Sequence, residues 1–240
     1  MALVASALGC LSVVVVVVVA AVVVGIVLRT RSKCALMVVL GSGGHTAEML
    51  TLVRSLPRAV AARERQQKQG GEGNTAAAAG EGISSLEGVG CTYPRCYVVA
   101  STDALSAEKA LRVETEAALG VVHVERIPRS REVGQSYITS ALTTVRATVA
   151  AIPILLKHAP KVLLVNGPGT CLPLCAIACA LRMLRMSHTR VVYVESAARV
   201  ESLSLTGRLL RDLRLADKLL VQWPELADSA RKVRFVGRLV

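Results

Sequence analysis

Residues 35–56, ALMVVLGSGGHTAEMLTLVRSL, decide the fold class of this chain. An apolar run, 35–40, ends at a cluster of three glycines, Gly41, Gly43 and Gly44. Apolar residues then recur at intervals of three and four, which is typical of a helix with one buried face. In α/β proteins a strand, a glycine-rich turn and a helix start form an anion pocket, because glycine permits close backbone approach and the helix start presents free N–H groups. The stretch therefore predicts a phosphate- or diphosphate-binding loop in an α/β domain.

The N-terminus carries a long uncharged stretch, residues 2–28, which includes an unbroken valine run from Val13 to Val19. As a helix rising ~1.5 Å per residue it is roughly 40 Å long, enough to cross ~30 Å of hydrocarbon. A cleaved signal peptide fits less well, since no charged region precedes the run and the run exceeds the usual ~7–15 residues. Basic residues at 29, 31 and 33 follow, and the positive-inside bias places the remaining chain in the cytosol. We therefore expect residues 1–33 to be a single-pass transmembrane anchor with a basic cytosolic flank.

The chain is basic, with 29 Lys and Arg against 17 Asp and Glu and a net charge of +12. Aromatic residues make up only 2% of the sequence, too few for base-stacking platforms, and no nucleic-acid-binding motif occurs, so we expect no nucleic-acid partner. An anionic membrane face or a phosphorylated ligand explains the charge better beside a transmembrane anchor. Seven cysteines without a disulfide-like framework are typical of a reducing cytosol.

Apolar strands alternate with amphipathic helices along the rest of the chain. The expected strands after the first are 96–101, 121–127, 162–166, 191–195, 218–222 and 233–236, and the expected helices are 105–118, 138–156, 171–184, 203–213 and a short one from Glu225. This alternation predicts one Rossmann-like, doubly wound parallel sheet in residues 34–240. Residues 57–92 interrupt the pattern. Because 66–90 is rich in Gly, Ala, Gln and Glu and lacks an amphipathic period, we expect 57–92 to be a disordered surface insertion.

The glycine-rich loop and the helix after it form the first candidate site. It is not a Walker A loop, because no Gly-Lys-Ser/Thr follows. It is an incomplete dinucleotide fingerprint, since Thr46 stands where the third glycine belongs, but Asp103 near the second strand keeps a nicotinamide-binding alternative open. His45 can act as a general base or donate to a phosphate, or it can be an ordinary surface or capping histidine. Glu48 complements the helix dipole, opposes a bound anion, or points at a sugar hydroxyl.

Three further loops are expected to end at the same edge of the sheet, where open α/β sheets bind ligands. Their candidate residues are Arg129, Arg131 and Glu132 after the third strand, Gly167, Gly169 and Thr170 after the fourth, and Glu195, Ser196 and Arg199 after the fifth. These groups can hold a diphosphate or a sugar, and each also has an ordinary interpretation as a solvated charge or a capped turn. Cysteines recur every four residues from 171 to 179, which predicts a packed helix stripe. We expect neither a metal nor a cofactor.

Six stretches carry a resemblance to a known family by their order and spacing. They are VVLGSGGHTAEML (38–50), RIPRSREVGQSY (126–137), LLVNGPGTCLPLC (163–175), VYVESAARVESLSLTGRLL (192–210), ADKLLVQWPEL (216–226) and FVGRLV (235–240). With the N-terminal anchor, the chain resembles the asparagine-linked glycosylation protein 14 family. The resemblance implies a fold similar to the N-terminal, acceptor-binding half of a GT-B glycosyltransferase, so that this chain would be half an enzyme and inactive alone.

The resemblance also implies a function at the cytosolic face of the endoplasmic reticulum membrane, with the N-terminus lumenal. The family anchors and recruits a soluble catalytic partner, asparagine-linked glycosylation protein 13, which carries most of the UDP-GlcNAc donor site. Together the two subunits would add the second GlcNAc to GlcNAc-diphosphate-dolichol, in the synthesis of the N-linked glycan precursor. Two alternatives remain open. One is a pure recruitment scaffold without a catalytic role, and the other is a membrane-tethered nucleotide-binding oxidoreductase.

Site roles follow from the resemblance by position. The residues that would face the acceptor diphosphate are Ser42, Gly43, Gly44 and Thr46. His45 is then the candidate catalytic base for the acceptor hydroxyl, with Glu48 as its rival. Glu195 and Arg199 would face the cleft between the two subunits. Residues 57–92 do not align with the family, and no role is implied for them.

Overall fold

A computed structural model of the chain describes residues 34–69, 93–117, 121–129, 137–167, 169–228 and 233–237. The expected anchor, residues 1–33, and residues 70–92 of the expected insertion lie outside this described part. Of the helices that it does contain, none combines the length and the apolar character needed to span a bilayer.

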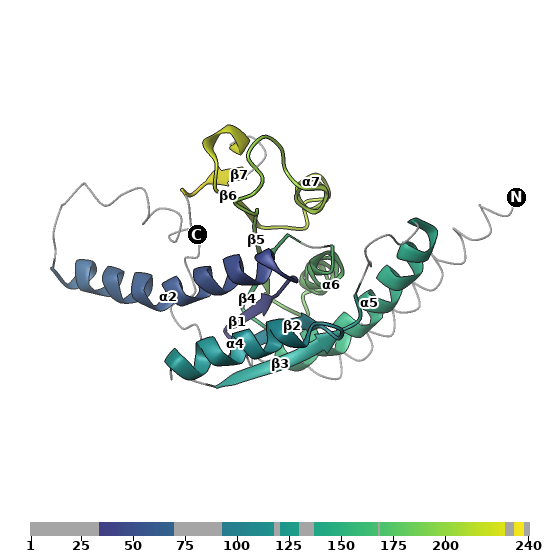
Figure 1. The fold of residues 1–240 in the computed structure, drawn as a ribbon, viewed down its shortest axis with the longest axis horizontal. Coiled ribbons are helices and arrows are strands. Elements are labelled where there is room, and N and C mark those ends of the chain that lie inside the picture. Colours follow the sequence, from purple (N-terminus) through teal and green to yellow (C-terminus); the bar gives the residue numbers. More distant parts are fainter. Residues whose placement is uncertain are drawn as a thin grey trace, which may run out of the picture.

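A seven-stranded sheet forms the centre of the domain (Figure 1). Its strands are β1 (Leu36–Val39), β2 (Arg95–Ala100), β3 (Val122–Ile127), β4 (Val162–Asn166), β5 (Arg190–Val194), β6 (Lys218–Val221) and β7 (Val233–Phe235). They lie in the order β3-β2-β1-β4-β5-β6-β7, and every neighbouring pair is parallel. The chain winds outward from β1 on one side and from β4 on the other. The sheet therefore has the doubly wound, Rossmann-like topology that the sequence predicted, with its switch point between β1 and β4.

Helices cover both faces of the sheet (Figure 1). They are α2 (Gly44–Gln69), α4 (Ala104–Ala117), α5 (Tyr137–His158), α6 (Cys171–Met183) and α7 (Leu205–Asp212), with a 3₁₀ turn, η1, at Pro224–Leu226. The buried side chains of α2 and α4 pack on one face, and those of α5, α6 and α7 pack on the other. The domain is thus a three-layer α/β/α sandwich.

The first strand illustrates why the sequence predicts this arrangement. Leu36 and Val38 belong to the core on the α2 and α4 side, whereas Met37 and Val39 belong to the core on the opposite side. Successive side chains of a strand point to opposite faces, so a strand that is covered on both faces reads as a continuous apolar run. The run LMVV is fully buried for this reason.

α2 is longer than the sequence analysis expected. It continues to Gln69, so residues 57–69 are helical and the expectation that they belong to a disordered insertion is wrong. Residues 58–69, RAVAARERQQKQ, are mostly strong helix formers, which sustain a helix without a core-facing period. α2 continues through Pro57, although proline has no backbone N–H to donate to the helix.

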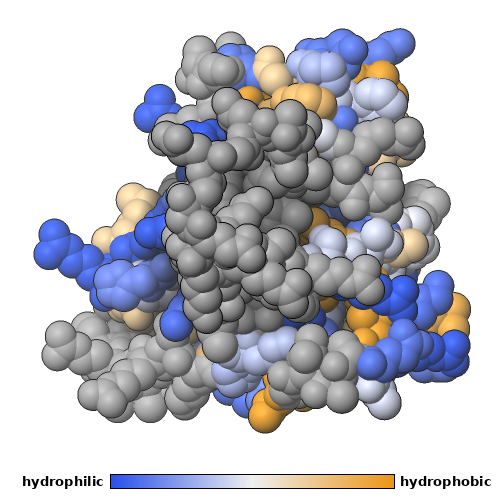
Figure 2. Space-filling model, turned by 90° about the vertical axis from the view of Figure 1, so that its left-hand side faces the viewer, coloured by the Kyte–Doolittle hydropathy of each residue, from blue (hydrophilic) through white to orange (hydrophobic). Residues whose placement is uncertain are grey.

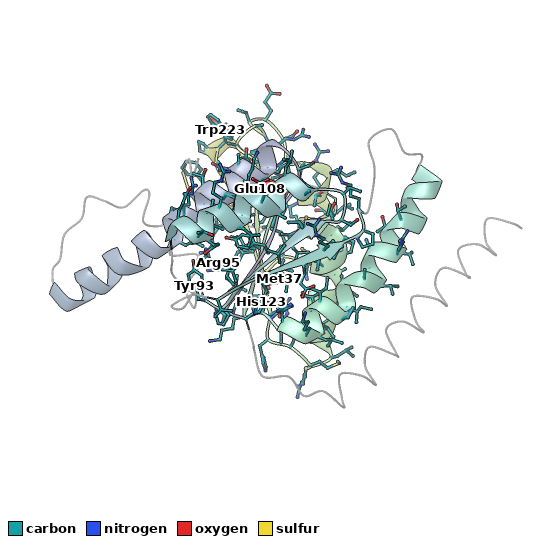
Figure 3. The ribbon with its side chains drawn as sticks, turned by 60° about the horizontal axis from the view of Figure 1, so that its bottom comes forward. Met37, Tyr93, Arg95, Glu108, His123 and Trp223 are labelled. Atoms are coloured by element: carbon teal, nitrogen blue, oxygen red, sulfur yellow. The ribbon has the colours of Figure 1, made fainter. Side chains whose placement is uncertain are left out.

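A buried polar cluster ties α4 to the start of β2. The guanidinium of Arg95, 2% exposed, donates to the carboxylate of Glu114, which also accepts from the hydroxyls of Tyr93 and Tyr97. The guanidinium also lies 4.3 Å from the centre of the Tyr93 ring. Burial, followed by the hydrogen bond to Glu114, raises the pKa of Tyr93 to about 12. Figure 3 shows Tyr93 and Arg95 close together and far from Trp223. Arg95 lies at the amino end of β2, whereas Trp223 lies beyond the carboxyl end of β6.

One face of the molecule is drawn in Figure 2 by hydropathy. The described residues visible there are mainly hydrophilic, and the apolar ones form separate small patches. Scattered apolar residues are normal on a protein surface.

Candidate functional site

Two loops meet at the switch point of the sheet. The loop after β1 leads into α2, the loop after β4 leads into α6, and β1 and β4 are paired neighbours. Gly43 and Gly167 have φ angles of +64° and +68°, a backbone region that favours glycine. Both helix starts therefore lie at one sheet edge, where Rossmann-like folds bind their ligands.

The start of α2 offers unpaired backbone donors to solvent. The first backbone bond into α2 runs from the N–H of Ala47 to the carbonyl of Gly43, at 3.4 Å. The N–H groups before Ala47 have no intrahelical carbonyl to bond, as at any helix start. Ser42, Gly43 and Gly44 are exposed, and a Cβ built on either glycine would meet nothing within 4 Å. The loop is therefore open enough to receive an anion.

His45 lies on the first turn of α2 and reaches across to β4. Its Nδ1 is 2.9 Å from Oδ1 of Asn166, the last residue of β4, which is 2% exposed. The ring also packs against Gly167, because a Cβ built there would lie 2.4 Å from Nδ1 and Cε1. The side chain of His45 is nonetheless 38% exposed. Its imidazole is therefore held on one side and open to solvent on the other.

Glu48 completes a polar network with His45. Its Oε2 accepts from Nδ2 of Asn166 at 3.0 Å, and its Oε1 accepts from the hydroxyl of Ser196 at 2.8 Å. The Nδ1 of His45 lies 4.0 Å from Oε2 of Glu48, whose side chain is 17% exposed. We call His45, Glu48, Asn166 and Ser196 the His45 network. Its members come from α2 and from the ends of β4 and β5.

Glu195 does not face a cleft, contrary to the expectation, because it is 0% exposed. Its carboxylate accepts from the hydroxyl of Tyr193, from the N–H of Ser196, and from both the N–H and the hydroxyl of Ser204. A buried carboxylate needs such donors, since burial without them costs several kcal/mol (~2–7 kcal/mol for a polar group). Glu195 therefore fixes the loop that presents Ser196 to Glu48. Arg199 is exposed on the same loop.

The side chains of Thr46, an expected acceptor contact, and of Asp103, named for the nicotinamide-binding alternative, both have partners within the fold. Thr46 is 1% exposed. Its hydroxyl donates to the carbonyl of Gly41 and lies 2.7 Å from the hydroxyl of Ser106. Only the backbone of Thr46 can therefore meet a ligand at this edge. Asp103 caps α4, with its two oxygens accepting from the N–H of Ser106 at 3.0 Å and from its hydroxyl at 2.7 Å. The acid that a nicotinamide ribose would need is thus engaged as a helix cap.

The remaining candidates lie at or near the same edge. Gly169 is exposed, and Thr170 stands at the N-cap of α6 without a capping side-chain bond. Arg129 follows β3, and its buried Nε has no hydrogen-bond partner in the structure. Arg131 lies outside the described residues. Across the described ranges, no group of His, Cys, Asp and Glu is arranged to hold a metal ion.

Asn166 is not among the site residues predicted from the sequence. The available signal was a single polar residue at the end of an otherwise apolar strand, VLLVN, directly before a glycine. Together the His45 network and the open start of α2 bring an imidazole next to the exposed backbone of a helix start. This pairing can bind a phosphorylated substrate and deprotonate a hydroxyl next to it.

Comparisons with known proteins agree on one family. Residues 36–239 match the family described as "Oligosaccharide biosynthesis protein Alg14 like". The chain is 37% identical over 218 residues to the UDP-N-acetylglucosamine transferase subunit ALG14 of Mus musculus, covering 88% of this chain and 85% of the relative. Its identity to the human protein of that name is 35% over 217 residues, covering 88% and 85%. For the Yarrowia lipolytica protein the identity is 37% over 207 residues, covering 85% and 81%.

A likeness to a solved structure was also found. The crystal structure of Acinetobacter baumannii MurG matches with a TM-score of 0.48 and 14% sequence identity. The match covers 85% of this chain and 45% of the MurG chain.

Proposed function

The chain belongs to the Alg14 family, and we propose that it is the membrane-anchoring, acceptor-binding subunit of a two-subunit UDP-GlcNAc transferase. The enzyme would add the second GlcNAc to GlcNAc-diphosphate-dolichol during synthesis of the N-linked glycan precursor. The curated relatives are named UDP-N-acetylglucosamine transferase subunits, and a subunit needs at least one other chain. In this proposal that chain is the soluble asparagine-linked glycosylation protein 13, which contributes most of the UDP-GlcNAc site.

The observation that carries the proposal is the position of His45. Its half-exposed imidazole stands beside the exposed backbone of Ser42, Gly43 and Gly44, at the start of α2. The acceptor would place its diphosphate against the free N–H groups of this turn, where the helix dipole favours negative charge. The first sugar of the acceptor would then project toward His45. Arg129, Arg131, Gly167, Gly169, Thr170 and Arg199 are the remaining residues proposed to contact the acceptor.

The proposed reaction is an inverting sugar transfer. The acceptor hydroxyl gives its proton to Nε2 of His45, and its oxygen forms a bond to the anomeric carbon of the donor GlcNAc. The bond from that carbon to the UDP oxygen breaks, and its electron pair leaves with UDP. A positioned general base contributes about 10²–10⁴-fold to such a step. Glu48 is the alternative base.

The anchor is the second part of the proposal. Residues 2–28 are uncharged, and basic residues at 29, 31 and 33 follow directly. A span with this flank would place its N-terminus in the lumen and the domain on the cytosolic face of the endoplasmic reticulum membrane. The described domain begins at Cys34, so the glycine-rich loop would be tethered close to the bilayer that carries the lipid acceptor.

Co-purification and transfer, measured on the same complex, test the proposal. The full chain is isolated in detergent with its partner and assayed for GlcNAc transfer to a GlcNAc-diphosphate-lipid. We expect the double variant Gly43→Ala/His45→Ala to retain the partner and to lose transfer by about 10²–10⁴-fold. The control His188→Ala removes an exposed histidine in the turn before β5 and should transfer normally. Wild-type transfer by the double variant would refute the catalytic role and favour a recruitment scaffold.

A further inference from the structure

We propose that Asn166 and Glu48 are positioning residues that hold His45 in one tautomer, with a hydrogen on Nδ1 and a lone pair on Nε2. The catalytic consequence rests on the function proposed above. The tautomer itself is a property of this chain, and it can be measured without any substrate. The inference also decides between His45 and Glu48 as the base.

The amide of Asn166 is oriented by the carboxylate of Glu48. An ionised carboxylate can only accept hydrogen bonds, and an amide carries one donor end and one acceptor end. Oε2 of Glu48 lies 3.0 Å from the amide of Asn166, so that amide must present its Nδ2 to the carboxylate. The reversed amide would place two acceptor oxygens in contact. The charge of Glu48 therefore sets the orientation of Asn166.

The imidazole of His45 is oriented in turn by Asn166. With Nδ2 committed to Glu48, the Oδ1 of Asn166 faces Nδ1 of His45 at 2.9 Å. Oδ1 can only accept, so Nδ1 must carry a hydrogen. A neutral imidazole carries one ring hydrogen, which leaves Nε2 with the lone pair. Nε2, the ring nitrogen that does not face Asn166, is thus the one that can take a proton.

The network is held by rigid parts of the fold. Asn166 is buried at the end of β4 and is paired in register with Val194 of β5. Ser196 is also buried and donates to the second oxygen of Glu48 at 2.8 Å. Gly167 packs against the ring at Nδ1 and Cε1. Asn166, Gly167 and Ser196 therefore come from the sheet or from a turn after a strand.

The same contacts assign a different role to Glu48. Both of its oxygens already accept, one from Asn166 and one from Ser196, and its side chain is only 17% exposed, so we assign Glu48 a positioning role. When Nε2 of His45 takes the acceptor proton, the ring becomes an imidazolium that still donates through Nδ1 to Asn166. Oε2 of Glu48, 4.0 Å from Nδ1, then stabilises the new positive charge. The amide of Asn166 gains and loses no proton in this step.

Nitrogen NMR of the full chain tests the tautomer directly. The chain contains four histidines, so selective ¹⁵N-histidine labelling in lipid nanodiscs gives few signals, and His45→Gln identifies those of His45. At a pH where the ring is neutral, we expect a protonated Nδ1 and an unprotonated Nε2. Asn166→Ala should abolish this preference. The control Thr189→Ala removes another buried polar side chain, whose hydroxyl donates to the carbonyl of Pro160 at 2.6 Å before β5, and should leave the His45 signals unchanged.

Two NMR results would overturn the proposal. One is a wild-type His45 with its hydrogen on Nε2, and the other is an Asn166→Ala variant with wild-type His45 signals. Transfer that survives His45→Ala would instead refute the catalytic role proposed for His45 and leave the tautomer result intact. The failure of each proposal is therefore recognisable separately.

Transfer kinetics of the complex show whether Glu48 positions His45 or is itself the general base. In Glu48→Gln the new amide oxygen can still accept from Asn166 while its nitrogen donates to Ser196, so we expect transfer within about tenfold of wild type. Glu48→Ala removes the contact and should lose about 10–100-fold, the usual effect of losing an orienting partner. If Glu48→Gln instead lost as much as Glu48→Ala, by about 10²–10⁴-fold, Glu48 would be the base and the proposal would be wrong.

Discussion

The imidazole of His45 and the backbone of Gly167 occupy adjoining space, such that a Cβ on Gly167 would lie 2.4 Å from Nδ1 and Cε1 of the ring. One residue belongs to the helix after β1 and the other to the turn after β4. Gly167 also has a φ of +68°, which side-chain-bearing residues rarely adopt. The turn after β4 must therefore be glycine for two reasons, its own backbone angle and the ring beside it.

Gly167→Ala should displace the imidazole and misalign its Nε2. We expect transfer by the complex to fall by about 10–100-fold, and the strained φ to cost about 1–3 kcal/mol of folding free energy. Gly169→Ala is the matched steric control, since its Cβ would meet nothing within 4 Å. The ¹⁵N signals of His45 should change in the first variant and stay in place in the second. Unchanged His45 signals in Gly167→Ala would show that the ring does not pack there.

Glu195→Gln should loosen the loop that carries Ser196. Both oxygens of the buried carboxylate accept hydrogen bonds. In Glu195→Gln one oxygen becomes an amide nitrogen, which cannot accept and therefore faces a donor. We expect a loss of about 1–3 kcal/mol, the cost of one unsatisfied buried polar group, measured by denaturant unfolding of the full chain in detergent. Glu201→Gln changes an exposed acid on the same loop and should stay within about 0.5 kcal/mol of wild type. Equal stability of the two variants would contradict the anchoring role of Glu195.

Stability should depend on pH through Glu125 on β3. Hydrogen bonds from Lys157 at 2.7 Å and from His158 at 2.8 Å lower the pKa of this carboxyl below its ordinary value of 4.5. A lowered folded-state pKa means that the stabilisation is complete above 4.5 and is lost as pH falls through the folded value. Wild type should therefore exceed Glu125→Gln in unfolding free energy near pH 7, and the difference should vanish in acid. Glu108→Gln, in an exposed pair with Arg112, is the control. A difference that persists unchanged at pH 2 would contradict this account.

Glu114→Ala should be among the most destabilising single changes in the domain. It leaves the guanidinium of Arg95, which is 2% exposed, without its carboxylate, and breaking one side of a buried ion pair costs about 3–5 kcal/mol. Glu116→Ala, two residues along α4, removes an exposed pair with Arg54 and should cost no more than about 1 kcal/mol. Thermal unfolding of both variants decides the matter. A similar fall in Tm for the two variants would show that the buried pair stabilises the domain no more than the exposed pair does.

The sequence predicted features that depend on local pattern and missed those that depend on distant contacts. The strand LMVV and the glycine cluster after it specify a buried strand and a tight turn within a few residues. By contrast, Asn166 meets His45 and Glu48, more than a hundred residues earlier in the chain, only because β4 pairs with β1. The sequence around Glu195 does not distinguish an exposed carboxylate that binds a ligand from a buried one. Only the fold shows that this carboxylate is buried and accepts hydrogen bonds from its own loop. Amphipathic period alone also missed the extension of α2 to Gln69, which helix propensity sustains.

A photoreactive acceptor tests most directly whether the lipid diphosphate lies over the start of α2. The full chain with its partner is irradiated with a GlcNAc-diphosphate-lipid that carries a diazirine on its sugar, and tryptic peptides are then mapped by mass spectrometry. Cleavage after Lys33, Arg54, Lys161 and Arg182 releases peptides 34–54 and 162–182, which contain the glycine-rich loop and the turn after β4. We predict that these two peptides carry the label and that unlabelled acceptor competes for it. Labelling concentrated elsewhere in the chain, with peptide 34–54 unmodified, would contradict an acceptor site at the switch point.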